Sequence, residues 1–305
     1  GGMLQLDYSA RGDFGVVLDQ QTAAHGLAAT AVGAGAQANG DFNTAIGAQT
    51  ETSDKSAVAI GGIADVLEDQ LGEEFAGVDL RNTQANGRLA TAIGAGAQAN
   101  EYAATAIGGL SNATGIRSIA IGYGTQATAY DATAIGDRAE ASEEWATAIG
   151  SGARATHLRS TALGSFATAA GDGASAFGDG ALANNIASVA LGSGSWATAA
   201  NSVAIGNGIV WNSNPWRDET VTFSEGIAIG NVSEVHGSRS IALGAGATVG
   251  GWSMPEADGL PSNIDDAVAL GAGSRADRNN TVSVGRAGAE RQITNVAAGT
   301  QATDA

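Results

Sequence analysis

Small apolar residues alternate with polar ones along most of the chain, and the alternation restarts at a regular interval. Each repeat carries an alanine, an apolar residue and a glycine in succession, and the eight successive intervals between Gly94 and Gly206 are each 14 residues long. A period of 2 indicates strands rather than helices, and a fixed interval is typical of stacked repeats. We therefore predict an all-β fold, a β-solenoid with two short strands per coil and a corner at each of sixteen glycines: Gly33, Gly47, Gly61, Gly94, Gly108, Gly122, Gly136, Gly150, Gly164, Gly178, Gly192, Gly206, Gly230, Gly244, Gly271 and Gly285.

The two strands of each repeat differ in their polarity. In the second strand small and polar residues alternate, as in Ala97-Gln98-Ala99, which is typical of a strand with one buried face and one wet face. The first strand is apolar or small on both faces, with Thr105 and Ile107 on one side and Ala106 on the other. We expect the isoleucine side to fill the coil and the alanine side to approach the same strand of a neighbouring chain. The sequence thus predicts a homo-oligomer.

Three interruptions break the 14-residue count, near residues 62–89, 209–223 and 251–266. The first is acidic with apolar residues at roughly helical spacing, so it is either an acidic binding lobe or a solvated loop with an apolar underside. The second contains two tryptophans and an arginine, and the third contains one tryptophan; both residue types are enriched at binding hot spots. Their candidate ligand-binding residues are Trp211, Trp216, Arg217 and Trp252. Alternatively, Trp211 replaces an inner Ala or Val and packs inward or across the axis of an oligomer.

Composition and charge exclude several classes of protein. The chain has 46 Gly but only 3 Pro, which excludes collagen, and it has no Cys, which excludes disulfides and thiolate metal sites. Its 14 Lys and Arg against 31 Asp and Glu give a net charge of −17, the opposite of what a nucleic-acid partner requires. Arg138, Arg154 and Arg159 fall within two coils and predict a local basic spot, which is a further candidate ligand-binding surface.

Nothing in the sequence indicates catalysis. His25, His157 and His236 belong to different coils. His157 and His236 occupy variable turn positions, and we expect each of these two to be an exposed polar residue. Metal-site, phosphate-loop and nucleophile motifs are not found, so we predict no catalytic, cofactor-binding or metal-binding residues. An ice-binding solenoid would need flat ranks of outward threonines. Thr105, Thr133, Thr147 and Thr161 do stack, but we expect them inside the coil with the isoleucines.

Two motifs carry a family resemblance. The run Asn201-Ser202-Val203-Ala204-Ile205-Gly206 and the tail at 291–300 followed by Thr303-Asp304-Ala305 resemble the head repeat and the neck of the trimeric autotransporter adhesins, the YadA-like family. The resemblance covers about residues 31–305. It implies a homotrimeric, left-handed parallel β-roll on the surface of a Gram-negative bacterium, at the outer membrane. Residues 1–30 would then be a tag remnant and a cap, 31–285 the head, and 286–305 the start of a neck leading to a stalk.

The resemblance also implies a function. The head would be non-catalytic and would attach the cell to host extracellular matrix or cell-surface molecules through three copies of each binding surface, without nucleic acid and without membrane contact by this segment. In the family, collagen binding is associated with repeated N-S-V-A-I-G units, and a single full match here weakens that assignment. The alternatives are a structural spacer, a mediator of autoaggregation or biofilm, and adhesion to abiotic surfaces.

Overall fold

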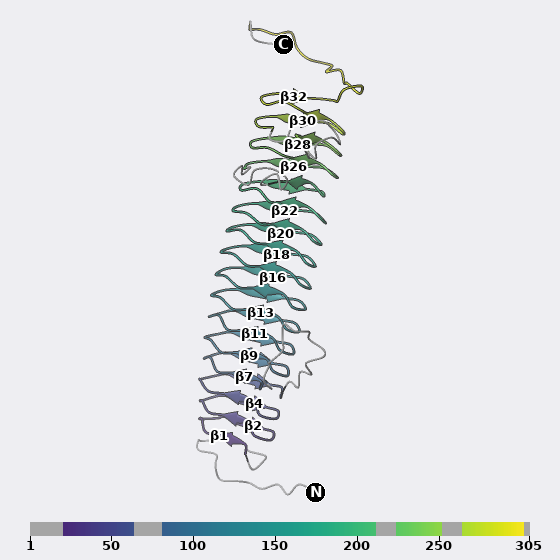
Figure 1. Cartoon of the computed structure of the whole chain (residues 1–305). Helices are drawn as coiled ribbons and strands as arrows, with labels where there is room; N and C mark the ends of the chain where they lie inside the picture. The colour runs from purple at the N-terminus through teal and green to yellow at the C-terminus, as the bar shows by residue number, and fades with distance from the viewer. Residues whose placement is uncertain (1–20, 64–80, 212–223, 252–263, 302–305) are drawn as a thin grey trace, which may run out of the picture. The chain divides into compact units, whose positions relative to one another are not determined.

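The computed structural model describes residues 21–63, 81–211, 224–251 and 264–301, and every regular element within these ranges is a β-strand. The chain divides into two compact units, Gly1–Gly194 and Ser195–Ala305. Each unit is a stack of coils that carry one three-residue and one two-residue strand, apart from the last strand of the second unit (Figure 1). The first interruption falls largely on residues 64–80, so the helix and the acidic lobe considered for it lie outside the described residues.

The strand bounds are as follows. Unit 1 contains β1 (Ala23–Ala24), β2 (Thr30–Val32), β3 (Gln37–Ala38), β4 (Thr44–Ile46), β5 (Glu51–Thr52), β6 (Val58–Ile60), β7 (Gln84–Ala85), β8 (Thr91–Ile93), β9 (Gln98–Ala99), β10 (Thr105–Ile107), β11 (Asn112–Ala113), β12 (Ile119–Ile121), β13 (Gln126–Ala127), β14 (Thr133–Ile135), β15 (Glu140–Ala141), β16 (Thr147–Ile149), β17 (Arg154–Ala155), β18 (Thr161–Leu163), β19 (Thr168–Ala169), β20 (Ser175–Phe177), β21 (Leu182–Ala183) and β22 (Val189–Leu191). Unit 2 contains β23 (Trp196–Ala197), β24 (Val203–Ile205), β25 (Ile209–Val210), β26 (Ile227–Ile229), β27 (Glu234–Val235), β28 (Ile241–Leu243), β29 (Thr248–Val249), β30 (Val268–Leu270), β31 (Arg275–Ala276) and β32 (Val282–Ser283).

Every strand pairs in parallel with its equivalent in the next coil. The odd-numbered and even-numbered strands of each unit form separate sheets, here called the odd sheet and the even sheet. In the even sheet β10 pairs with β12 so that Ala106 faces Ala120, a step of 14 residues. The interruptions leave this register intact, since Ala59 of β6 pairs with Ala92 of β8. The predicted parallel β-solenoid of 14-residue repeats is therefore confirmed, and its regular pairing already includes β1 at Ala23.

The predicted orientation of the first strand is wrong. Ala106 is fully buried, whereas Thr105 and Ile107 lie on the outer face and are partly exposed. The inner position of the odd sheet is also alanine in most coils, as at Ala99 and Ala113. Two short strands joined by tight corners leave a narrow interior, which alanine fills in most coils, and overpacking such a space is costly. The isoleucine and threonine ranks therefore form the outer surface of the even sheet.

The two corners of the coil are built differently. At the first corner, Gly108 has a φ of +127°, and a Cβ there would lie 2.3 Å from the carbonyl oxygen of Gly122 in the next coil, so only glycine fits. At the second corner a residue with φ near +55° is usually not glycine. We call this set of equivalent positions the corner rank. In unit 1 from β9 onward it comprises Ala103, Arg117, Asp131, Trp145, Arg159, Gly173 and Ala187; in unit 2 it comprises Asn201, Glu225, Arg239, Asp266 and Asn280.

Candidate ligand-binding surfaces

A ladder of arginine and aromatic side chains runs along the second corner of unit 1. The Arg117 Nε donates a hydrogen bond of 2.6 Å to Asp131 Oδ1, and its Nη2 contacts Asp131 Oδ2 and the hydroxyl of Tyr130. Its guanidinium carbon lies 4.6 Å from the Tyr130 ring centroid. Tyr130 meets Trp145 edge to face at 6.1 Å, and the Arg159 guanidinium lies 5.1 Å from the centroid of Trp145. The ladder thus spans four successive coils, and sequence reasoning missed it although its corner residues are 14 apart.

The charges in this ladder stabilise one another. The hydrogen bonds from Arg117 hold the pKa of the Asp131 carboxyl below its ordinary value, and burial of the group only partly opposes this. The same contact raises the pKa of Arg117. Both groups are solvent-exposed, so the pair orders the corner more than it contributes to the free energy of unfolding.

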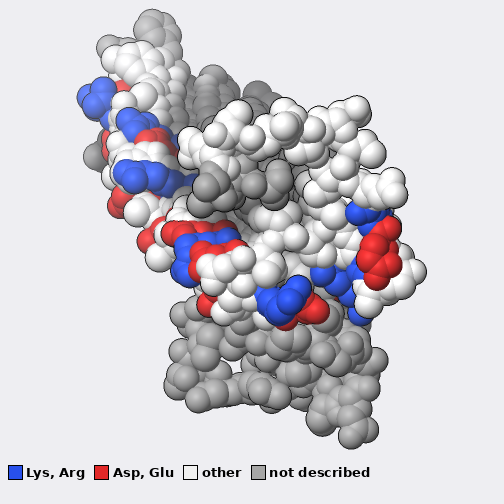
Figure 2. Space-filling model, turned by 90° about the horizontal axis from the view of Figure 1, so that it is seen from above, with Lys and Arg blue, Asp and Glu red and all other residues white. Residues whose placement is uncertain are grey.

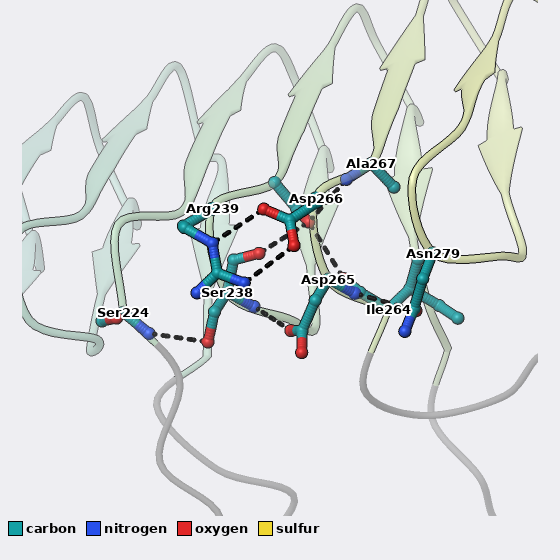
Figure 3. A network of polar contacts seen from close by, with 9 residues as sticks. Ser224, Ser238, Arg239, Ile264, Asp265, Asp266, Ala267 and Asn279 are labelled. Atoms are coloured by element: carbon teal, nitrogen blue, oxygen red, sulfur yellow. Dashed lines mark hydrogen bonds and ion pairs between the residues drawn. The ribbon is translucent and has the colours of Figure 1, made fainter.

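Unit 2 contains the same corner-rank pair on a second polar network (Figure 3). Arg239 Nε and Nη2 donate to the two carboxylate oxygens of Asp266 in the next coil, both at 2.7 Å. The pKa of Asp266 is lowered by these bonds. Next to the pair, the Asp265 carboxylate accepts a hydrogen bond from the backbone N–H of Ser238. A corner-rank arginine followed by a corner-rank aspartate therefore forms a bidentate ion pair in both units.

The three arginines of the predicted basic spot do not share one corner of the coil. Arg138 lies at the first corner, Arg154 in β17 of the odd sheet, and Arg159 at the second corner. Arg154 pairs with Glu140 at 3.1 Å. The face of the molecule in Figure 2 shows basic and acidic side chains next to one another in small groups. Of the three predicted arginines, Arg159 alone joins the ladder.

Trp211 belongs to an aromatic stack on the odd sheet of unit 2. Its ring meets that of Trp196 edge to face at 6.1 Å and stacks on His236 with centroids 5.9 Å apart. His236 is 6% exposed, and its Nε2 lies 3.1 Å from Glu234 Oε2. The expectation of an exposed His236 is therefore wrong, because the interruption after Trp211 hides which residues align between these coils. Trp216, Arg217 and Trp252 lie outside the described residues.

The N-S-V-A-I-G run forms scaffold. Asn201 occupies the corner rank with a φ of +53°, and the Ser202 hydroxyl donates to the Ala199 carbonyl at 2.6 Å. Ala204 points inward and is fully buried, whereas Val203 and Ile205 are half-buried on the outer face. The motif therefore supplies one more rung of the outer apolar rank.

That outer rank leaves large apolar side chains uncovered. Ile93 is 36% exposed, Leu163 44% and Leu191 46%. These residues occupy equivalent positions of their coils, and the isoleucines between Ile93 and Leu163 are partly exposed, so apolar surface runs along the even sheet of unit 1. Large continuous apolar surface marks an interaction face.

Metal and membrane features were sought in the described ranges. No group of three or more His, Cys, Asp or Glu residues there is placed to hold a metal ion. Within the same ranges, no helix has the length and apolar character needed to cross a membrane.

Comparison with known proteins agrees with the sequence resemblance. A family model described as YadA head domain repeat (2 copies) matches well over half of the chain, at residues 24–42, 44–62, 85–111, 113–139, 127–153, 141–167, 155–181, 183–208, 224–247 and 265–286. Among solved structures, the chain is similar to the crystal structure of the collagen-binding domain of the Yersinia adhesin YadA, with 28% identity over 64% of this chain and 80% of that one and a TM-score of 0.33. A comparison with curated proteins finds no match.

Proposed function

Because the chain belongs to the family of YadA head domain repeats, we propose that it is the non-catalytic head of a homotrimeric surface adhesin. In this proposal the head runs from the first regular coil at Ala23 to residue 285, and residues 286–305 begin the neck. The head is an extracellular passenger of a Gram-negative bacterium, held at the outer membrane by parts of the protein beyond this segment.

The observation that carries the trimer is the outer rank of isoleucine and leucine on the even sheet. Leu163 and Leu191 are almost half exposed in the single chain, and burying such a rank against a neighbouring chain stabilises association by roughly 25 cal/mol per Å² of apolar surface. Light scattering coupled to size exclusion tests this directly. We expect a mass of three chains for the chain alone, and a monomer overturns the proposal.

The ligands of the head are host matrix or cell-surface molecules. Support comes from family membership and from the exposed ladder at the second corner, which a trimer presents in three copies so that avidity exceeds single-site affinity. A solid-phase assay of the trimer on collagen, fibronectin and laminin, with cultured cells in parallel, tests this role. Failure on all four surfaces, with aggregation of expressing bacteria in the absence of host ligand, would favour a self-association or spacer role; retention on plastic alone would favour abiotic adhesion.

A second candidate function follows from the corrected strand orientation. Thr105, Thr133 and Thr147 lie on the outer face and not inside the coil, so the objection to an ice-binding surface does not hold. Val58 and Ile119 interrupt the threonine rank, and in a trimer this face is covered. Thermal hysteresis by a monomeric chain would establish this second function, and its absence would remove it.

A further inference from the structure

A polar hollow of about 510 Å³ opens at the first corner of neighbouring coils in unit 1. Four of its lining residues occupy equivalent positions, two residues before β1, β3, β5 and β7: Gln21, Gly35, Gln49 and Asn82. The wall continues with Gln37 of β3 and Glu51 of β5, on the outer face of the odd sheet. Four neighbouring coils in register therefore build the hollow together.

The hollow exists because one coil has glycine where its neighbours have a long side chain. A Cβ on Gly35 would have only atoms of Gln49 near it, the closest at an ordinary 3.4 Å. Thr50, which also lines the hollow, is fully buried, and its hydroxyl donates to the carbonyl of Gly47 at 3.1 Å. The polar groups available to a ligand are therefore those of the walls.

The four amide side chains of the walls have no hydrogen-bond partner within the part of the chain that the structure describes. The next amide of the odd sheet differs, since Gln84 Nε2 donates to Glu51 Oε2 at 3.2 Å. That bond orients the Glu51 carboxylate and engages one of its two oxygens. The hollow thus presents four amides and one carboxylate oxygen that can bond to a ligand.

We infer that this hollow is a binding site for an uncharged sugar, held by the four wall amides and by the Glu51 carboxylate. Each amide offers two N–H donors and a carbonyl acceptor, whereas a carboxylate offers acceptors only. A sugar hydroxyl both donates and accepts, so neighbouring hydroxyls match such a set. The volume also lies in the range of about 300–1,000 Å³ that ligand pockets occupy. This inference rests on the proposed adhesive function and names one class of ligand for it.

The composition of the walls disfavours other classes of ligand. Among the described residues that line the hollow, Glu51 is the one charged residue, and the chain has a net charge of −17, so an anionic sugar is repelled. No aromatic or large apolar side chain is among these lining residues, which disfavours an apolar ligand. A single carboxylate is a poor site for Ca²⁺, which takes about six to eight oxygen ligands.

The hollow stays accessible in the proposed trimer. Gln37 and Glu51 lie on the outer face of the odd sheet, whereas the interchain contact is proposed for the even sheet. Hydrogen bonds to a sugar replace bonds to water, so the net gain of each is small. We therefore expect weak binding per site, amplified by the three copies of a trimer.

The test is a saturation-transfer difference NMR titration of the purified chain with lactose, maltose and N,N′-diacetylchitobiose, in the presence of EDTA. 3′-Sialyllactose is the anionic probe, and CaCl₂ without sugar is titrated separately by calorimetry. We expect saturable binding of at least one of the three neutral disaccharides, with a lower Kd than that of sialyllactose. We expect no saturable binding of calcium.

Two variants locate the binding in the hollow. Gly35→Leu fills the space with an apolar side chain and should abolish detectable binding. The backbone accepts leucine there, since Leu110 lies two residues before β11, at the equivalent position of its coil, with a φ of +56°. Gln37→Ala removes one wall amide and should raise the Kd roughly threefold to tenfold, the usual loss for one hydrogen bond.

The matched control is Gly180→Leu. Gly180 lies two residues before β21, its φ is +60°, and a Cβ there would have no atom within 4 Å. The same change is thus made at the same corner in a coil that does not line the hollow, and it should leave the Kd unchanged. Melting curves verify that each variant is folded.

Three outcomes overturn the assignment: no binding of any of the three neutral disaccharides, tighter binding of sialyllactose than of all three, or unchanged binding in Gly35→Leu. Calcium binding that Gly35→Leu abolishes, without any sugar binding, would assign the hollow to a cation and overturn the sugar. If every sugar fails while the chain still adheres to cultured cells, this site is wrong and the adhesive function stands. If adhesion fails while a neutral sugar binds, the reverse holds.

Discussion

A Cβ atom on Gly226 would lie 2.6 Å from Cγ1 of Val210. Unit 2 carries Val210 and Val235 at inner positions that are alanine in most coils of unit 1, and both are fully buried. Neighbouring coils have Ser202 and Ser240 at the position of Gly226. The glycine therefore leaves the space that the two larger valines occupy.

Gly226→Ala should destabilise the chain by about 1–3 kcal/mol, the usual cost of adding a methyl group to a filled core. Denaturant unfolding measures this loss. Val210→Ala in the same background should recover part of it, because the two side chains share one space and their effects are not additive.

The matched control is Gly109→Ala, where the new Cβ would meet Tyr123 at an ordinary 3.4 Å. We expect a change within about 0.5 kcal/mol, as for most surface substitutions. Equal losses at Gly109 and Gly226 would contradict the packing argument.

The strand register of this fold could be predicted from the sequence, but which side chains of the first strand face the interior could not. Glycines such as Gly108 are required because the next coil approaches closely, so their 14-residue spacing equals the number of residues in one coil. In contrast, Ala106 and Ile107 are both apolar, and alternation alone does not say which faces inward. Hydrophobicity favours the larger residue, whereas the narrow interior holds the smaller residue in most coils.

Ile149→Glu should lower the mass of the assembly toward a single chain while the coils stay folded. Ile149 belongs to the outer rank of β16, and a buried unpaired carboxylate between chains is strongly unfavourable. Light scattering and circular dichroism together measure both effects.

Gln126→Glu adds the same charge on the exposed outer face of the odd sheet and should leave the mass unchanged. If Ile149→Glu also leaves it unchanged, the even sheet is not the interchain face.

Acid should loosen the second corner of unit 1. The pKa of Asp131 is lowered in the folded chain from an ordinary 3.8, so its contribution is present above that value and is lost as the pH falls through the lowered folded pKa. We expect the melting temperature of the native chain to fall more than that of Asp131→Asn between pH 5 and pH 2. Parallel curves for the two chains would show that the pair contributes nothing to stability.

Arg291→Ala should expose the last coil of unit 2. Arg291 Nη1 donates to Ser274 Oγ at 2.9 Å and to the Val284 carbonyl at 2.7 Å, and Nη2 donates to the Ala272 carbonyl. Losing these bonds should cost about 1 kcal/mol or more, and hydrogen exchange at residues 282–285 should rise about fivefold.

Arg291→Lys keeps the charge but cannot reach all three acceptors, so it should restore only part of the protection. Full restoration would mean that charge alone closes this end of the stack.

The candidate sites were harder to predict than the fold. Arg159 stood out in the sequence as a charge, but its partner Trp145 is recognisable only when residues 14 apart are placed side by side. The contact between Trp211 and His236 could not be found in this way, because the interruption between them makes their sequence separation differ from 14 residues.

The identical inner alanines of successive coils also bear on how such a head changes length. Ala106, Ala120 and Ala134 meet the same partner above and below, so removing one whole coil joins two surfaces that already match. A deletion of fourteen residues therefore shortens the stack by about 4.8 Å and leaves the core unchanged. The length of the stack can thus change separately from the chemistry of its surface.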